Sequence, residues 1–114
     1  MKEYAIFDSK SKIEIQIKVG QNALENWLLI DESKQNDIWF HIEGYPSPHV
    51  IIYVPPKSKI SKQTIKYAAS LCKSNSKFKG NNQVAIIYTQ MKNISKGDQV
   101  GSVFLKKRTQ KIII

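Results

Sequence analysis

NDIWFHIEGYPSPHVIIYV, residues 36–54 of a chain of 114, predicts the strand pair around which the rest of the fold is organised. Apolar and polar side chains alternate in both halves of this stretch, as they do along strands that bury one face. The apolar face carries Ile38, Phe40, Ile42, Val50, Ile52 and Val54. Between the two halves, residues 44–48 (GYPSP) supply the glycine and prolines that favour a tight loop.

The opposite face of this hairpin has an unusual composition. If His41 lies opposite His49, then Trp39 lies opposite Ile51 and Asp37 opposite Tyr53. Both histidines and one of the two tryptophans of the chain fall on this face, although hydrocarbon packing does not require them. Asp37, Trp39, His41, His49 and Tyr53 are therefore the first candidates for a functional or structural polar cluster.

Length and composition indicate one soluble domain spanning residues 1–114. The hydrophobic content of 41% is ordinary, and the longest uninterrupted apolar run, residues 50–54, is far shorter than the ~20 residues of a membrane helix. No signal peptide precedes the first predicted strand. The lone cysteine, Cys72, favours a reducing compartment. We expect a cytoplasmic or nuclear protein without a membrane-inserted segment.

The net charge of +9 is unevenly distributed along the chain. Residues 1–43 carry five lysines and eight acidic side chains, a net charge of −3. Residues 44–114 carry thirteen basic side chains and a single acid, Asp98, a net charge of +12. Such segregation favours a surface that faces a polyanion, although lysines that serve only solubility remain the alternative.

Two strands and a short helix are predicted before the central hairpin. Residues 4–8 and 13–19 alternate as strands, with Ile13, Ile15, Ile17 and Val19 directed inward. Residues 22–30 predict a short helix, whose apolar face comprises Leu24, Trp27 and Leu28 at helical spacing.

A longer helix is predicted at residues 62–73, with Ser61 as its N-cap. Its buried stripe comprises Ile65, Ala68, Ala69 and Cys72, the last packing as a small apolar side chain. Lys62, Lys66 and Lys73 form a second stripe that we expect to be solvated, and Lys77 and Lys79 follow in a polar loop. These lysines are candidates for contacts with nucleic acid.

The C-terminal third predicts further strands. The nearly continuous apolar run at residues 84–89 is typical of a central strand. Residues 100–105 and 110–114 predict a closing hairpin, whose turn carries Lys106, Lys107 and Arg108 as further binding candidates. Strands that outnumber helices without strict alternation predict an α+β fold, a single domain with a mostly antiparallel sheet, one long helix and one short helix.

The motifs of this chain resemble a known family, the NFACT-R domain. In order they are Val19-Gly20-Gln21-Asn22, Asp37-Ile38-Trp39-Phe40-His41, Pro46-Ser47-Pro48-His49-Val50, Ala68-Ala69, residues 84–89 and Gly101. The resemblance spans residues 13–114. Shorter matches resemble the stand-alone branch of the family, that of coiled-coil domain-containing protein 25: Lys73-Ser74-Asn75-Ser76, Tyr88-Thr89 and Asn93.

The resemblance implies a non-catalytic nucleic-acid-binding domain with no cofactor. Large members of the family accompany factors that act on stalled ribosomal subunits carrying tRNA, so RNA and the ribosome are the implied partners. Gly20, Asn22, Asp37, Phe40 and Gly101 are then motif positions of structural importance. Gln21 stands where the family often has arginine, and Pro48 where serine or alanine is usual. Because the charged tail of the stand-alone branch is absent, we expect a truncated form.

Four interpretations of the polar hairpin face remain open. Asp37, His41 and His49 offer zinc-ligand chemistry, and Ser47 with a histidine and Asp37 can be written as a catalytic triad. Neither interpretation has supporting spacing or a glycine-rich oxyanion loop. A purely structural network is the third. The fourth is a binding face, with Trp39 and Tyr53 stacking on bases and His41 and His49 as donors.

Two classes of function follow from these observations. The charge distribution favours a nucleic-acid-binding module, most readily for RNA, with DNA as the alternative ligand. A protein-docking module, in which the aromatic face holds a partner and the lysines only solubilise, is the second class. Nothing in the sequence favours an enzyme.

Overall fold

The central hairpin lies in the middle of a six-stranded sheet in the computed structural model, which describes residues 1–114. Strands β3 (Ile38–Ile42) and β4 (Val50–Ile52) pair antiparallel, with Trp39 opposite Ile51 and Phe40 opposite Val50. The predicted register is therefore confirmed. Both strands have neighbours on their outer sides, so they form the buried centre of the sheet.

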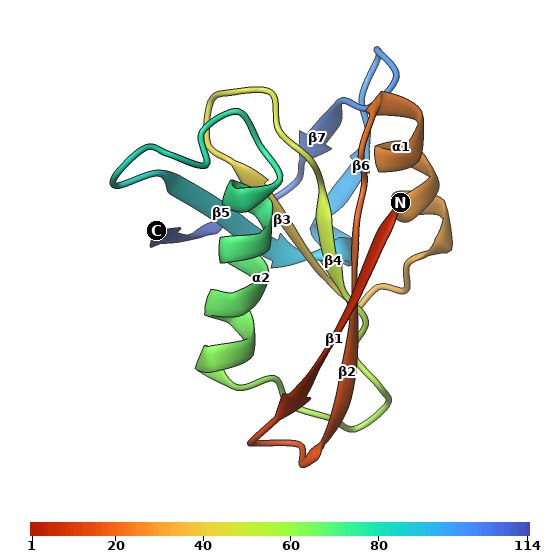
Figure 1. The fold of residues 1–114 in the computed structure, drawn as a ribbon. Coiled ribbons are helices and arrows are strands. Elements are labelled where there is room, and N and C mark those ends of the chain that lie inside the picture. Colours follow the sequence, from red (N-terminus) through yellow and green to blue (C-terminus); the bar gives the residue numbers. More distant parts are fainter.

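The other four strands flank this pair in the order β1-β2-β4-β3-β5-β8, and all pairings are antiparallel. β1 (Lys2–Asp8) and β2 (Ile13–Val19) form the N-terminal hairpin. β5 (Ala85–Gln90) is an inner strand, as its apolar run predicts, and β8 (Gln110–Ile113) forms the far edge. Figure 1 shows the long β1–β2 hairpin beside the shorter central strands. The α+β class is confirmed.

Helix α2 (Lys62–Ser74) covers one face of the sheet (Figure 1). Its buried side chains, which include Ala68, Ala69 and Cys72, contact Phe40 and Ile86 of the sheet in the main hydrophobic core. The Ser61 hydroxyl caps the helix by accepting a hydrogen bond from the Thr64 amide. This confirms the predicted N-cap and the buried position of the Cys72 thiol.

The opposite face is covered by helix α1 (Ala23–Glu32) and by a small separate sheet, β6 (Ile94–Lys96) and β7 (Val103–Leu105). A one-turn 3-10 helix, η1 (Met91–Asn93), connects β5 to β6. A second core lies between these elements and the sheet, made of Leu29, Trp39, Ile51, Ile87, Met91 and Ile94. The sheet is therefore buried on both faces at its centre, and neither helix is long and apolar enough to cross a membrane.

The face that α1 buries differs from the prediction. Leu24 and Leu28 are 62% and 41% exposed, whereas Asn26 and Leu29 are buried. The helix turns Asn26 inward because its side-chain amide accepts a hydrogen bond from a backbone amide of the central hairpin. Trp27 remains half-buried and donates its indole N–H to the Ser102 carbonyl at 2.8 Å.

Two strand predictions also need correction. The predicted closing hairpin does not form, because β7 pairs with β6 while β8 pairs with β5 and extends the main sheet. Ile13 was expected to point inward but is 40% exposed. It pairs with Asp8 at the very end of the β1–β2 hairpin, whereas Ile15 and Ile17, further along β2, belong to the main core.

Candidate functional site

Trp39 and His49 form a buried hydrogen-bonded pair, each about 1% exposed. The Trp39 indole N–H donates to His49 Nδ1 at 3.1 Å, so the neutral His49 ring carries its proton on Nε2. Burial, with a smaller contribution from neighbouring His41, lowers the pKa of His49 from 6.5 to about 3. The expectation that Trp39 presents an open stacking surface and His49 a donor to a ligand is therefore wrong for this conformation.

The backbone of His49 is held as firmly as its ring. Its amide donates to Asn26 Oδ1 at 3.0 Å, and its carbonyl accepts from the Gly20 amide at 3.0 Å. A Cβ at Gly20 would lie 2.2 Å from Asn26 Oδ1, so only glycine fits beside this amide. Asn26 was missed from the sequence, where its only signal was a polar side chain three positions before the buried Leu29.

Asp37 ties together the two ends of the central hairpin. Its carboxylate oxygens accept from the Val54 amide at 2.9 Å and from the Lys34 amide at 2.8 Å, and the side chain is 2% exposed. Tyr53 is half-buried and its hydroxyl has no hydrogen-bond partner. Burial and the nearby Glu32 and Asp37 raise the pKa of Tyr53 to about 12. Through its hydrogen bonds to the Val54 and Lys34 amides, Asp37 therefore fixes the geometry of the hairpin.

The metal and triad interpretations find no support in the geometry. No three histidine, cysteine, aspartate or glutamate side chains gather in a way that could hold a metal ion. The Ser47 hydroxyl accepts from the Ile42 amide and donates to the Pro48 carbonyl, each at 3.0 Å, and does not contact a histidine. Burial raises the pKa of the adjacent Cys72 thiol to about 12. Ser47 and Cys72 thus fix the β3–β4 loop against α2.

His41 is the half-buried member of the aromatic cluster. Its ring stacks on that of Trp39, with 5.5 Å between centroids and 8° between planes. Its Nδ1 contacts the Ile42 carbonyl at 2.5 Å, and because a carbonyl only accepts, Nδ1 is the donor. Burial lowers the pKa of His41.

His41 lies in a cleft of about 880 Å³, which we call the motif cleft. Its walls are residues 19–23, 44–49, 75–77 and 99–103, together with Lys2, Asn26 and His41. All four of these wall segments contain residues of motifs singled out in the sequence. No acidic side chain lines the cleft, whereas two lysines, Lys2 and Lys77, do.

Gly101 brings the β6–β7 turn against the start of α1 and so closes one wall of the cleft. Its φ of +87° is a conformation that glycine adopts readily. A Cβ at this position would also lie 2.8 Å from the Cβ of Ala23. The late glycine of the motif is therefore explained by both conformation and contact.

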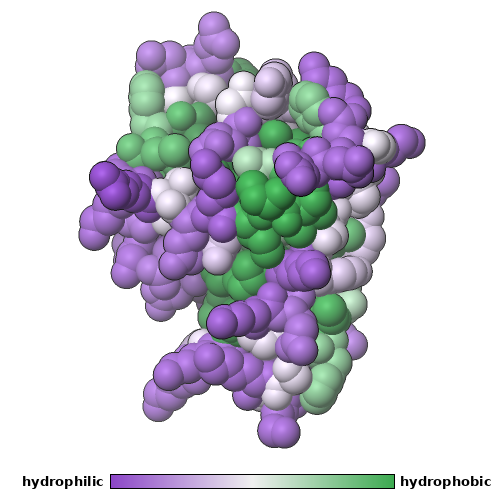
Figure 2. Space-filling model, turned by 90° about the vertical axis from the view of Figure 1, so that its left-hand side faces the viewer, coloured by the Kyte–Doolittle hydropathy of each residue, from purple (hydrophilic) through white to green (hydrophobic).

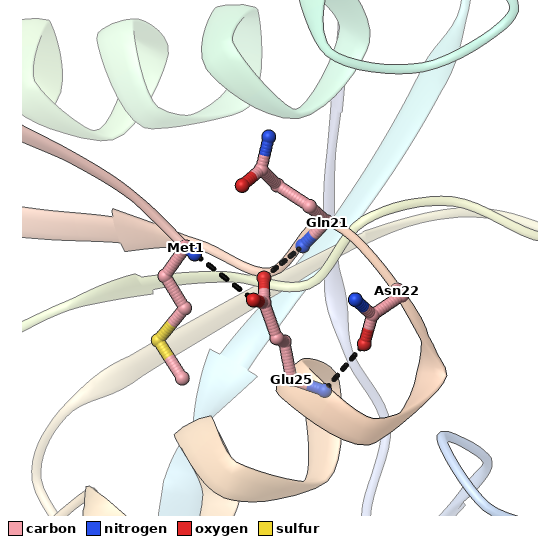
Figure 3. A network of polar contacts seen from close by, with 4 residues as sticks. All are labelled: Met1, Gln21, Asn22 and Glu25. Carbon is pink, nitrogen blue, oxygen red and sulfur yellow. Dashed lines mark hydrogen bonds and ion pairs between the residues drawn. The ribbon is translucent and has the colours of Figure 1, made fainter.

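The start of α1 forms another wall, and Figure 3 shows how it is fixed. Asn22 Oδ1 caps the helix by accepting from the Glu25 amide at 2.9 Å. The Glu25 carboxylate accepts from the Gln21 amide at 2.9 Å and from the N-terminal ammonium at 3.0 Å, contacts that lower its pKa. The Gln21 side chain points away from this network (Figure 3), and it lines the cleft wall. Its side-chain amide, unlike its backbone amide, makes no bond to this network.

The predicted basic residues are distributed over three segments. Lys62 and Lys66 are exposed on α2, Lys77 and Lys79 are exposed in the α2–β5 connection, and Lys106, Lys107 and Arg108 are exposed between β7 and β8. Lys73 departs from the prediction, because it is half-buried and its Nζ donates to the Ile114 carbonyl at 3.2 Å.

Figure 2 shows a hydrophobic patch surrounded by hydrophilic side chains on the side where α2 lies.

Only Lys77 among these predicted residues lines the motif cleft, where the unpredicted Lys2 joins it. Lys77 Nζ lies 5.5 Å from the centroid of the Phe78 ring, and that ring contacts Tyr45 of the cleft wall with 5.0 Å between centroids. The α2–β5 connection and the β3–β4 loop are thus joined by aromatic contact.

The fold and the motif cleft define a small α+β domain with a groove that no acidic side chain lines. The motifs on the walls of this groove are those of a known family. The model of the NFACT protein RNA binding domain matches residues 3–107, and the chain belongs to this family. The resemblance found in the sequence is confirmed.

Relatives of known name include both large and small proteins. The chain is 32% identical over 83 residues to the Rqc2 homolog RqcH of Bacillus subtilis, covering 72% of this chain and 14% of that protein. It is 37% identical over 89 residues to protein JLP2 of Saccharomyces cerevisiae, covering 71% of this chain and 42% of JLP2. It is 34% identical over 85 residues to mouse coiled-coil domain-containing protein 25, covering 70% and 40% respectively.

A solved structure shares the fold along the whole chain. It is the C-terminal part of the fibronectin/fibrinogen-binding protein from Streptococcus suis, with a TM-score of 0.81 and 26% identity. The match covers 100% of this chain and 45% of that one. The chain therefore spans less than half the length of each of these similar proteins.

Proposed function

We propose that this domain binds RNA without catalysing a reaction, and that the RNA chain enters the motif cleft while exposed lysines hold its phosphates. The observation that carries this proposal is the absence of any acidic side chain from an 880 Å³ cleft that has Lys2 and Lys77 on its walls. Membership of an RNA-binding family supports the same ligand. A polyanion would meet no repulsive carboxylate there.

The ligand we propose is single-stranded or looped RNA, bound with little sequence preference. Lysine contacts to phosphates carry no base information, and unpaired segments are the part of RNA that a cleft can admit. The similarity to the Rqc2 homolog RqcH supports tRNA or rRNA in ribosome-associated quality control as the setting. We propose the cytoplasm or nucleus as the location, on the lone Cys72 of the sequence.

The test is a fluorescence-anisotropy titration of the protein against a labelled single-stranded RNA at several salt concentrations. If about four lysines engage phosphates, log K falls with log salt at a slope near −3, taking ~0.7 per contact. Lys77→Glu should weaken binding, and Lys92→Glu, an exposed lysine of η1 outside the cleft, serves as the matched control. Salt-independent binding, or none at low salt, would contradict the proposal.

Protein docking is the second candidate, and a specific observation favours it. Several large apolar side chains of α1 and β7 are exposed: Leu24 (62%), Leu28 (41%), Phe104 (53%) and Leu105 (46%). Substituting Leu24 and Phe104 by serine leaves RNA affinity unchanged if the cleft is the binding site. If this variant folds but no longer binds RNA, the exposed apolar side chains of α1 and β7, and not the cleft, form the binding interface.

A further inference from the structure

His41 presents a hydrogen-bond acceptor, rather than a donor, to the motif cleft. Its Nδ1–H donates a hydrogen bond to the Ile42 carbonyl, and a neutral imidazole has only one N–H group, so Nε2 carries a lone pair. Burial of the ring lowers its pKa and keeps this neutral form.

The Nε2 atom is free to receive a ligand group. It makes no hydrogen bond within the protein, and the only fully buried side-chain nitrogen or oxygen without a partner is the Tyr53 hydroxyl. Nε2 is therefore accessible, and His41 lies on the cleft wall. Stacking on Trp39, whose own ring is bonded to His49, fixes the orientation of the imidazole.

Because the lone pair of His41 Nε2 accepts a hydrogen bond, the ligand group that lies against it must be a hydrogen-bond donor. Phosphate oxygens and base carbonyls are acceptors and would be repelled by Nε2. Exocyclic amines and ring N–H groups of bases are also donors, but they differ from base to base and are the same in RNA and in DNA of matching sequence. The ribose 2′-hydroxyl is a donor that every RNA nucleotide carries and DNA lacks.

We propose that His41 Nε2 accepts a hydrogen bond from a ribose 2′-hydroxyl, which makes His41 the residue by which this domain distinguishes RNA from DNA. The inference rests on the proposed function, because it assumes that nucleic acid enters the cleft. The neutral side-chain amide of Gln21, which also lines the cleft, can bond a sugar or base, while Lys77 neutralises a phosphate. The cleft volume of about 880 Å³ is in the range of pockets that enclose a small ligand.

The probes are three labelled oligonucleotides of about 12 nucleotides, a length within the site sizes of single-strand binders. They are oligouridine, its 2′-deoxy counterpart and its 2′-O-methyl counterpart; uracil is chosen because it has no exocyclic amine. One neutral hydrogen bond should favour the ribose form over the deoxy form by roughly two- to tenfold. The 2′-O-methyl form lacks the donor and should bind no better than the deoxy form.

His41→Phe keeps a ring that stacks on Trp39 but removes Nε2. We expect this variant to bind the ribose and deoxy forms equally, because the 2′-hydroxyl has lost its acceptor. Lys77→Glu is the matched control, since it should weaken both forms alike and leave their ratio unchanged. Thermal unfolding of each variant checks that it is folded.

Each failure has a distinct meaning. Tight binding of both forms with no ribose preference in the parent, or a preference that His41→Phe retains, would overturn the inference and leave the proposed function standing. Absence of binding to all three probes at low salt would overturn the proposed function. If His41→Phe does not fold, the 2′-O-methyl probe decides on the parent protein, because 2′-O-methyl RNA that binds as tightly as the ribose form would overturn the inference.

Discussion

His49 illustrates how a single polar residue can specify the shape of a loop from inside a sheet. Ring and backbone are used separately: Nδ1 accepts from Trp39, while the amide and carbonyl engage Asn26 and Gly20. A buried polar group stabilises a fold only where its hydrogen bonds are satisfied, so these partners constrain one another. The histidine that the sequence suggested as a ligand donor instead positions the cleft wall.

At this residue scale, the pKa of His49 predicts a pH dependence of stability. The unfolded chain, with a pKa of 6.5, binds a proton below that pH, whereas the folded chain does so only below about 3. Between these values the free energy of unfolding falls as pH falls, approaching about 1.4 kcal/mol per pH unit. Urea unfolding at pH 6.5, 5.5 and 4.5 measures the slope, and His49→Gln should flatten it. A parent protein equally stable at all three values would contradict the assignment.

Asp37 gives the second prediction at the residue scale. Asp37→Ala leaves the Val54 and Lys34 amides without their acceptor, at a cost of ~1–3 kcal/mol for each group that stays buried. The matched control is Asp31→Ala, since Asp31 makes only an exposed ion pair with Lys96 and should change stability by less than about 1 kcal/mol. Urea unfolding compares the two, and equal losses would contradict a structural role for Asp37.

At the scale of elements, sequence periodicity predicted those features of the helices and strands that interactions between residues close in sequence determine. The α2 boundaries, its cap and the β3–β4 register follow from side-chain spacing and turn chemistry within short windows. The pairing of β7 with β6 could not be predicted, because β7 is only three residues long and its partner, β6, is placed by contacts with α1. The inward turn of Asn26 depends on the His49 amide, 23 residues away.

The same limit applies to the candidate site. His41 and Lys77 could be selected from the sequence, but Lys2 and Asn26 could not, because they reach the cleft only through the tertiary fold. Trp39 was misassigned because alternation placed it opposite the main core, and the second core on that face has no signature in a local window. Periodicity reports which face a side chain occupies, not what covers that face.

Gly101 provides a prediction about the element that closes the cleft. Gly101→Ala places a methyl group 2.8 Å from Ala23 Cβ at a φ of +87°, so we expect a loss of ~1–3 kcal/mol and a displaced β6–β7 turn. Gly80→Ala is the control, because a Cβ at Gly80 meets nothing within 4 Å. Thermal unfolding measures both variants. The RNA affinity of the Gly101 variant should also fall, since the cleft wall moves.

At the scale of the whole molecule, charge and fold are organised separately. Eight of the thirteen basic side chains after residue 43 lie on α2, in the α2–β5 connection and in the β7–β8 turn. None of these lysines is needed by the cores, except that Lys73 bonds the C-terminal carbonyl. Surface charge can therefore change without changing the fold, which makes long-range attraction to RNA testable by itself.

Charge reversal on α2 tests this separation. Lys62→Glu with Lys66→Glu changes the net charge from +9 to +5, and both side chains are exposed, so thermal unfolding should be nearly unchanged. Affinity for unrelated RNA sequences should fall alike, and the salt slope should lose ~0.7 for each lysine that contacts a phosphate. Lys34→Glu with Lys92→Glu, an equal charge change outside the motif cleft, separates a local contact from the overall field. Equal losses in the two double variants would assign the effect to net charge alone. A folded Lys62/Lys66 variant with undiminished affinity would mean that α2 does not face the RNA, and the binding surface would then be limited to the cleft and its lysines.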